Sequence, residues 1–167
     1  MASETKRGKS KPISGPMTIA DLWRKMQSLP LGKQAFSKLL GVRIPYSGSI
    51  GAEIVELADG HAVVKLGDRR AVRNHLNSIH AIALMNLGEL ATGLAVFHKL
   101  DGSAKGIITE LRMTYAKKAR GTITARCDVT FPELTGKHDL LVEGALTDEK
   151  GDEVARVYAT WKIQAGD

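Results

Sequence analysis

A single carboxylate, Glu89, stands in the middle of a long apolar stretch of the sequence. Between Ile79 and Phe97 no other Asp, Glu, Lys or Arg occurs, and the apolar residues would surround a helix on nearly every side. Such a helix must be wrapped by other structure, and an ionised carboxylate inside it is costly without compensation. Glu89 is therefore the first candidate for chemistry, as a general base or a nucleophile, and burial should raise its pKa.

Two polar side chains stand just before this stretch, Asn74 in a polar loop and His80 where the helix is expected to start. Ser78 is a favourable N-cap, so we expect the helix to begin at Ile79. The first N–H groups of a helix have no partner within it and lie at the positive end of the helix dipole. Such groups near His80 and Ala81 could stabilise a developing oxyanion.

Each of these residues also has a structural interpretation. Glu89 could be hydrogen-bonded to a neighbouring element or to a partner chain, and His80 could cap the helix or pack. Asn74 could close its loop through a bond from its side chain to the backbone. Asn86, one turn before Glu89, is interpreted as a helix-contact residue, and Cys127 as a core residue rather than a nucleophile.

The remaining sequence predicts an antiparallel sheet curved around the helix. Two strand-like runs, 52–57 and 61–66, are joined by Ala58-Asp59-Gly60, a hairpin signal. After the helix, which we expect to end near residue 100, four runs alternate apolar and polar residues. Their apolar faces are Ile107, Thr109, Leu111, Met113 and Tyr115; Ile123, Ala125, Cys127, Val129 and Phe131; Leu140, Val142, Gly144 and Leu146; and Ala155, Val157, Ala159, Trp161 and Ile163. One apolar face per strand indicates an α+β fold with about six strands wrapped around one long central helix.

Composition indicates one globular domain of 167 residues, 43% hydrophobic and 25% charged. The formal net charge is +6, and residues 1–16, rich in Lys, Ser, Gly and Pro, carry half of it. We therefore expect a flexible basic leader, residues 1–16, followed by a single domain, residues 17–167. Basic and aromatic residues do not interleave on one face, so the sequence does not indicate a nucleic-acid partner.

Two short helices are expected ahead of the sheet. The capping box Thr18-Ile-Ala-Asp21 predicts the start of the first, and Pro30 interrupts it. We expect the second to cover Lys33 to Leu40 and to end at Gly41. These helices could form a lid or entry arm, or simply pack on the core.

The sequence favours a cytoplasmic protein without a membrane span. A lone cysteine, Cys127, excludes an internal disulfide and suits a reducing compartment. The first residues contain no apolar segment typical of a secretory signal. Residues 79–97 are barely long enough to cross a bilayer, and Asn86 and Glu89 at their centre argue against a lipid-facing helix.

The loop and helix resemble the hotdog acyl-CoA thioesterases of the phenylacetyl-CoA thioesterase type. That family carries an Asn in the loop, a His or Gly region at the helix start, and a carboxylate nine residues after the His. Asn74, His80 and Glu89 stand at these positions. The similarity extends more loosely from Leu39-Leu40-Gly41-Val42 to the end of the chain, and includes Leu111-Arg112-Met113-Thr114-Tyr115 after the helix. It implies the hotdog fold.

The chain departs from the family pattern at three places. Asn77-Ser78-Ile79 stands where the family often has Gly-Thr before the His, and Ala81-Ile82 stands where it often has Gly-Gly. Some relatives place a Ser on the strand after the helix. Here Ile108 occupies that place, with Thr109 adjacent as the candidate for contact with substrate.

The resemblance implies hydrolysis of acyl-CoA thioesters, with Glu89 as base or nucleophile and with Asn74 and the helix start polarising the thioester. Coenzyme A would arrive as part of the substrate, and no separate cofactor is expected. His75 and His80 would diverge on a helix, which argues against a metal pair. The phosphates of coenzyme A would suit a set of basic residues that could equally be solvated surface: Arg69, Arg70, Arg73, Lys117, Lys118 and Arg120.

Two other functions remain open. The first is a non-catalytic hotdog module that binds acyl-CoA or a fatty acyl group. The second is a hydratase or dehydratase on the same fold, although those enzymes generally pair a His with a carboxylate at positions that the sequence does not show.

The spacing of the candidate residues predicts a homodimer with shared active sites, which could pair further into a dimer of dimers. Nine residues separate His80 from Glu89, or roughly 13 Å along a helix. A thioester at the helix start would then lie beyond the ~3 Å reach of the same chain's Glu89. Two antiparallel helices about a two-fold axis would bring each Glu89 to the other chain's Asn74 and His80. Gly88, Ala91 and Ala95 could let these helices approach closely.

Overall fold

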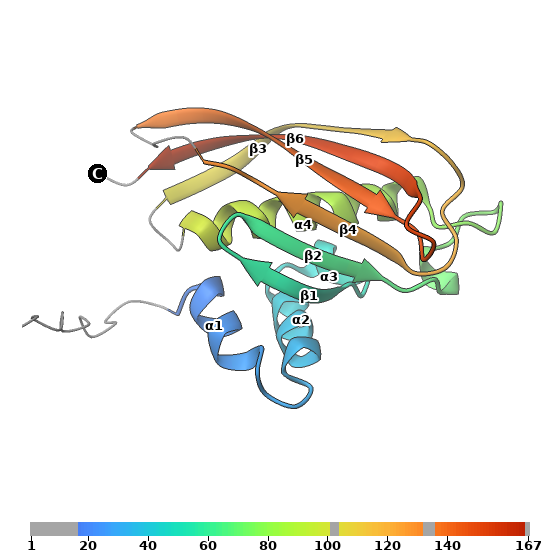
Figure 1. The fold of residues 1–167 in the computed structure, drawn as a ribbon, viewed down its shortest axis with the longest axis horizontal. Helices are drawn as coiled ribbons and strands as arrows, with labels where there is room; N and C mark the ends of the chain where they lie inside the picture. The colour runs from blue at the N-terminus through green and yellow to red at the C-terminus, as the bar shows by residue number, and fades with distance from the viewer. Residues whose placement is uncertain (1–16, 101–103, 132–135, 166–167) are drawn as a thin grey trace, which may run out of the picture.

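A six-stranded antiparallel sheet curves around one long helix, α4 (Ala81–Leu100), in the computed structural model of the protein (Figure 1). The structure describes residues 17–100, 104–131 and 136–165. The predicted leader, residues 1–16, lies outside this described part. A curved antiparallel sheet around a central helix is the hotdog fold, so the α+β architecture expected from the sequence is confirmed.

The strand order places β1 and β3 at the two edges of the sheet. In spatial order the strands are β1 (Glu53–Ala58), β2 (His61–Leu66), β4 (Ile123–Asp128), β5 (Lys137–Thr147), β6 (Glu153–Ala165) and β3 (Ala104–Tyr115). The predicted hairpin joins β1 to β2, with Ala58 paired to His61. All of these pairs are antiparallel.

The helix α4 packs into the concave face of the sheet. By length and composition it could cross a membrane, yet 67% of its apolar window is buried inside the fold. Ala91 and Ala95 have no exposed surface, and a Cβ atom added at Gly88 would lie 2.8 Å from the Cβ of Val157 on β6. The prediction that these small residues face a partner helix is therefore wrong, because the chain's own sheet covers them.

The helix also begins two residues later than predicted. Ile79 forms a bridge with Arg73, and its N–H donates to the carbonyl oxygen of Ala119 at 2.9 Å. Extended backbone at Ile79 cannot belong to a helix, so Ser78 is not the N-cap. The sequence signal was misleading because the bond to Ala119 comes from a segment distant in the chain.

A β-bulge reverses part of the predicted face of β3. The register between β3 and β6 shifts between Ile108 and Glu110, which inserts Thr109 as an extra residue. Residues before a bulge therefore point the opposite way from the simple alternation. Ile107 is 65% exposed on the outer face, whereas Ile108 packs against the core with Leu111.

Three helices, α1 (Ile19–Met26), α2 (Gly32–Arg43) and α3 (Pro45–Ser49), precede the sheet. The capping box between Thr18 and Asp21 is confirmed. Gly41 does not end the second helix as predicted, and α3 was not predicted at all. Gly41 instead allows contact with Gly48, since a Cβ atom on Gly48 would lie 2.4 Å from the Gly41 carbonyl oxygen.

This close approach predicts the effect of one added methyl group. We expect Gly48→Ala to lower the free energy of unfolding by about 2 kcal/mol, because the backbones of α2 and α3 would have to separate. Thermal or urea unfolding measures the loss. Gly67→Ala is the matched control, since a Cβ atom at Gly67 meets nothing within 4 Å. Equal stability of the two variants would contradict the contact.

Candidate active site

His80 caps the helix α4. Its Nδ1 atom accepts the backbone N–H of Ile82 at 3.1 Å, and its carbonyl oxygen accepts the N–H of Leu84 at 3.1 Å. Because a backbone N–H can only donate, Nδ1 carries no proton and the neutral ring holds its proton on Nε2. His80 is exposed, so this Nε2–H can donate to a ligand.

Asn74 organises the loop that leads into the helix. Its Oδ1 atom accepts the backbone N–H groups of Leu76 at 2.9 Å and Ser78 at 3.3 Å, and the hydroxyl of Ser78 at 3.2 Å. The loop-closing interpretation of Asn74 therefore holds for the oxygen. Within the described residues its amide Nδ2 makes no hydrogen bond, so the nitrogen remains a donor for a bound group.

The positive end of α4 presents an open backbone donor beside His80. The N–H of His80 itself donates to the carbonyl oxygen of Val72 at 2.8 Å, so it cannot contribute to an oxyanion site. Within the described part of the chain the N–H of Ala81 donates to no other group. Tyr115 on β3 reaches the same turn, where its hydroxyl donates to the carbonyl oxygen of Ala81 at 3.2 Å. The helix start therefore offers the Ala81 N–H, supported by the helix dipole.

Glu89 lies half-buried on α4, and desolvation raises the pKa of its carboxyl above the ordinary value. A hydrogen bond from the Ser47 hydroxyl opposes this effect by stabilising the carboxylate. Ser47 is only 8% exposed and comes from α3, which packs on α4. The sequence analysis did not identify Ser47. Pro45 is typical of the first position of a helix and could have indicated the short helix α3 that carries Ser47.

A pocket of about 100 Å³ lies against Glu89. Phe97 and Trp161 form one wall, with their rings edge to face and 5.2 Å between centroids. Gly93 gives this pocket room, because a Cβ atom there would lie 3.3 Å from the Trp161 ring. The other lining residues are Ile19, Ile44, Ser47, Leu90 and Leu94. The pocket is thus mainly apolar, with one carboxyl and one hydroxyl group.

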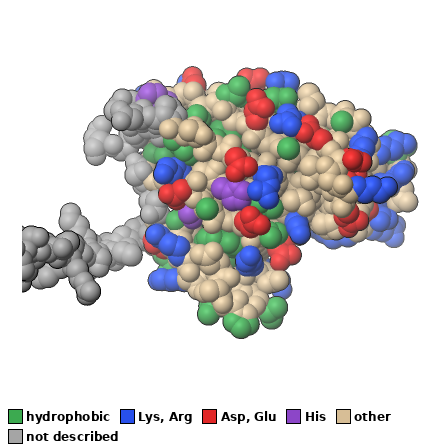
Figure 2. Space-filling view, in the orientation of Figure 1, with side chains coloured by type: hydrophobic (Ala, Val, Ile, Leu, Met, Phe, Trp, Pro, Cys, Tyr) green, Lys and Arg blue, Asp and Glu red, His purple; other side chains and the backbone are tan. Residues whose placement is uncertain are grey.

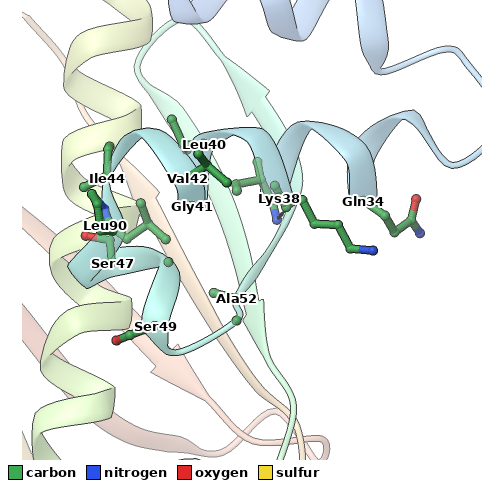
Figure 3. Close-up of a pocket in the computed structure, with 15 residues that line it drawn as sticks. Gln34, Lys38, Leu40, Gly41, Val42, Ile44, Ser47, Ser49, Ala52 and Leu90 are labelled. Atoms are coloured by element: carbon green, nitrogen blue, oxygen red, sulfur yellow. Dashed lines mark hydrogen bonds between the residues drawn. The ribbon is translucent and has the colours of Figure 1, made fainter.

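A larger groove of about 700 Å³ meets this pocket at three shared residues, Ile44, Ser47 and Leu90. It follows α2 and α3 along β1, and Figure 3 shows Leu90 and Ser47 at one end with Lys38 and Gln34 toward the other. The groove and the pocket beside Glu89 are therefore neighbours, with Ile44, Ser47 and Leu90 lining both.

Asn86 joins α4 to α3, as expected for a helix-contact residue. Its Nδ2 atom donates to the carbonyl oxygen of Tyr46 at 3.1 Å. Its Oδ1 atom is buried and accepts no hydrogen bond within the described residues. An unsatisfied buried acceptor one turn from Glu89 adds polarity to this side of the helix.

One chain does not bring Glu89 to the helix start. Asn74, His80 and Ala81 gather at the first turn of α4, whereas Glu89 faces α3 more than two turns later.

Thr109, the candidate for contact with substrate, lies on the bulge of β3. Its Oγ1 atom donates to the carbonyl oxygen of Thr160 at 3.2 Å.

Two of the predicted phosphate-binding cations are engaged in ion pairs. Arg73 contacts Asp68, with 2.5 Å between Nε and Oδ1, and Lys117 lies 2.7 Å from both Asp148 and Asp152. These partners raise the pKa values of Arg73 and Lys117. Lys118 is exposed beside this cluster.

Neither a metal centre nor a cysteine nucleophile is indicated in the part that the structure describes. No group of three His, Cys, Asp or Glu side chains there could hold a metal ion. Cys127 is buried, and burial raises the pKa of its thiol to about 12, so the sulfur stays protonated at neutral pH. Its predicted place in the core is confirmed.

Several solved structures share this fold. A structural-genomics crystal structure is 28% identical, with a TM-score of 0.77 over 89% of this chain and 99% of that chain. A Pseudomonas aeruginosa protein called a probable thioesterase is 23% identical, with a TM-score of 0.71 over 82% and 97% of the two chains. A Staphylococcus aureus thioesterase is 19% identical, with a TM-score of 0.64 over 72% and 98%. These likenesses support the hotdog fold.

No curated protein matches the chain. A family match does cover most of it, from residue 32 to residue 163, and so includes α2, α3, the helix α4 and nearly the whole sheet. The protein therefore belongs to the family described as Domain of unknown function (DUF4442).

Proposed function

We propose that this protein hydrolyses acyl-CoA thioesters, with Glu89 as the general base or nucleophile. The observation that carries the proposal is a half-buried carboxyl with a raised pKa, set between an apolar pocket and a hydrogen-bonding hydroxyl. A base with a raised pKa takes protons more readily near neutral pH. The names of several structural neighbours as thioesterases support the same reaction class.

As a general base, Glu89 removes a proton from water while the water oxygen attacks the thioester carbonyl carbon. In the shared site proposed below, the resulting oxyanion accepts hydrogen bonds from the Ala81 N–H and the Asn74 Nδ2 of the second copy of the chain, and the same copy's His80 orients the thioester through its Nε2–H. The intermediate then collapses, the C–S bond breaks, and the leaving sulfur takes the proton from Glu89. The products are a carboxylic acid and the coenzyme A thiol.

Glu89 can alternatively attack the carbonyl carbon itself. This route expels the thiolate and leaves a mixed anhydride that water hydrolyses. Both routes use the same donors at the helix start, so the stabilisation of the oxyanion does not distinguish them.

The separation of Glu89 from the helix start supports a homodimer with shared sites. Strand β3 lies at a sheet edge with one side unpaired in the single chain, and 12 residues are available for pairing with a second β3. The less buried stripe of α4 includes Ile82, Met85 and Glu89. A two-fold axis near Met85 sets Glu89 of one helix opposite Ala81 of an antiparallel partner, because Met85 is midway between them. A dimer of dimers would preserve these sites.

Coenzyme A enters only as part of the substrate. With Arg73 and Lys117 engaged by carboxylates, the exposed Lys118 is a candidate among the predicted cations to take its phosphates. The acyl group would occupy the pocket beside Phe97 and Trp161. We further propose that the protein acts in the cytoplasm.

A non-catalytic acyl-CoA-binding module is the second candidate. It is favoured by Thr109, whose hydroxyl is engaged by the Thr160 carbonyl instead of pointing freely at a substrate. Release of free thiol from a panel of acyl-CoAs distinguishes the two functions, because an enzyme turns over whereas a binding module only saturates.

Replacing the carboxyl of Glu89 tests its role in the reaction. We expect Glu89→Gln to lower kcat at least ~100-fold, because the amide can neither take a proton nor attack. The folded protein raises the pKa of this carboxyl, so deprotonation above that pKa costs stability. The variant should therefore be as stable as the wild type near pH 4 and more stable near pH 8. Glu143→Gln, exposed on β5, is the control, and wild-type turnover in Glu89→Gln would rule out the assignment.

Removing the Ser47 hydroxyl tests the electrostatics of the same group. The hydrogen bond lowers the pKa of Glu89, so Ser47→Ala should raise it. If the carboxylate is the active form, the acidic limb of kcat/KM must move to higher pH. Ser49→Ala, on the same short helix, should leave the limb in place. A limb that stays in place or moves to lower pH in Ser47→Ala would contradict the pairing.

Subunit exchange tests whether the site is shared. Asn74→Ala and Glu89→Gln proteins should each be nearly inactive alone. A mixed dimer has one site with both substitutions and one with neither, so it should recover about half of the wild-type activity. Activity measured after mixing, with exchange followed by a fluorescent label, gives the answer. Exchange without recovery, or a fully active monomer in sedimentation, would refute the shared site.

A further inference from the structure

Exposed apolar side chains concentrate in the helices ahead of the sheet, residues 17–50, here termed the arm. Of the twelve large hydrophobic residues exposed in the described part of the chain, seven belong to it. They are Met17, Leu29, Leu31, Leu39, Val42, Ile44 and Tyr46. Scattered exposed hydrophobic residues are ordinary, but a concentration of this kind marks an interaction surface.

The turn between α1 and α2 holds two leucines outward. Leu31 is 76% exposed and has a φ of 57°, a left-handed conformation that is rare for a bulky residue. The turn is held by backbone bonds, from the Leu29 N–H to the Met26 carbonyl oxygen at 3.0 Å and from the Gly32 N–H to the Leu29 carbonyl oxygen at 2.9 Å. The turn therefore presents Leu29 and Leu31 to solvent in an ordered conformation.

The outer side of α2 continues this surface. Phe36 and Leu40 face the core, whereas Leu39 and Val42 are 53% and 81% exposed on the other side. Figure 2 shows hydrophobic side chains along the lower edge of the molecule, where Figure 1 places the α1–α2 turn, with Lys and Arg side chains on the flanks.

The arm is also strongly basic for its size. It holds Arg24, Lys25, Lys33, Lys38 and Arg43 against a single acid, Asp21, for a net charge of +4. Residues 51–167 hold fifteen Lys and Arg against sixteen Asp and Glu. Asp21 is paired with Arg24 at 2.8 Å, while Lys25, Lys38 and Arg43 are exposed. Basic and apolar side chains are thus combined on one small unit of the fold.

We propose that the arm docks on an anionic lipid bilayer, with Leu29 and Leu31 entering the interface and the cations contacting the headgroups. A second copy of the chain would bring two surfaces of net charge +4 together, which is unfavourable. Nucleic acid would leave the leucines in water. A negatively charged bilayer satisfies both features, because it accepts apolar side chains below the headgroups and attracts Lys and Arg above them.

This docking has a consequence for the groove beside α2. Lys38 and Val42 belong to the exposed side of α2 and also line the groove that ends at Ser47 and Leu90. A docked arm would therefore place the outer end of the groove near the membrane surface. The proposal goes beyond the thioesterase reaction and does not depend on it.

Co-sedimentation of the full chain with vesicles tests the docking. We expect binding to vesicles of equal parts phosphatidylglycerol and phosphatidylcholine, weak binding to phosphatidylcholine alone, and loss of binding as salt is raised. Leu31→Asn should weaken binding about tenfold without unfolding the protein, because Asn accepts a left-handed backbone. Each of Lys25→Gln and Lys38→Gln should weaken it about fivefold.

Matched controls come from the sheet rather than the arm. Leu141→Asn removes a leucine that is 61% exposed on β5, and Lys65→Gln removes an exposed cation on β2. Both should bind anionic vesicles like the wild type. The proposal fails if the wild type does not sediment with anionic vesicles, or if Leu31→Asn and Leu141→Asn bind equally well. It also fails if Leu31→Asn abolishes self-association in sedimentation velocity, since the surface would then contact a second copy.

Discussion

The structure depends on the burial of one apolar helix that has no fully polar side. Because α4 is apolar on most sides, leaving it in contact with water would be unfavourable, and the sheet curves around it. The small residues Gly88, Ala91 and Ala95 let the sheet approach the helix closely. One chain cannot enclose the helix completely, and the less buried stripe carries Glu89. The carboxyl is therefore neither hydrated freely nor fully buried, which is the condition that raises its pKa while leaving it accessible.

The polar groups around α4 are divided between two places with different electrostatics. At the first turn, His80 and Asn74 satisfy some donors through their own acceptor atoms and leave the Ala81 N–H open at the positive end of the helix. Further along, Ser47 partly compensates Glu89 in apolar surroundings. The donors that could stabilise an anion and the carboxyl that could transfer a proton therefore lie at different places on α4. An antiparallel pair of chains is the arrangement that we propose brings them together.

The helices ahead of the sheet contribute more than packing. Through α3 they place Ser47 beside Glu89, and through α2 they form a wall of the neighbouring groove (Figure 3). The contact of Gly41 with Gly48 sets α3 close against α2. The same unit has an outer surface that combines leucines and cations, so one small segment links the environment of the carboxyl to the exterior of the protein.

The sequence by itself determined the local patterns and the global class. The apolar helix, the alternating strands, the capping box at Thr18 and the core position of Cys127 follow from periodicity and side-chain chemistry, which act over a few residues. Only the tertiary structure decided the rest. The start of α4 depends on Val72 and Ala119, the outward turn of Ile107 on a bulge against β6, and the role of Ser47 on the packing of α3. The ion pairs of Lys117 depend on Asp148 and Asp152, about thirty positions later in the chain. These outcomes rest on contacts between segments far apart in the chain, and local propensity carries no information about which segments will meet.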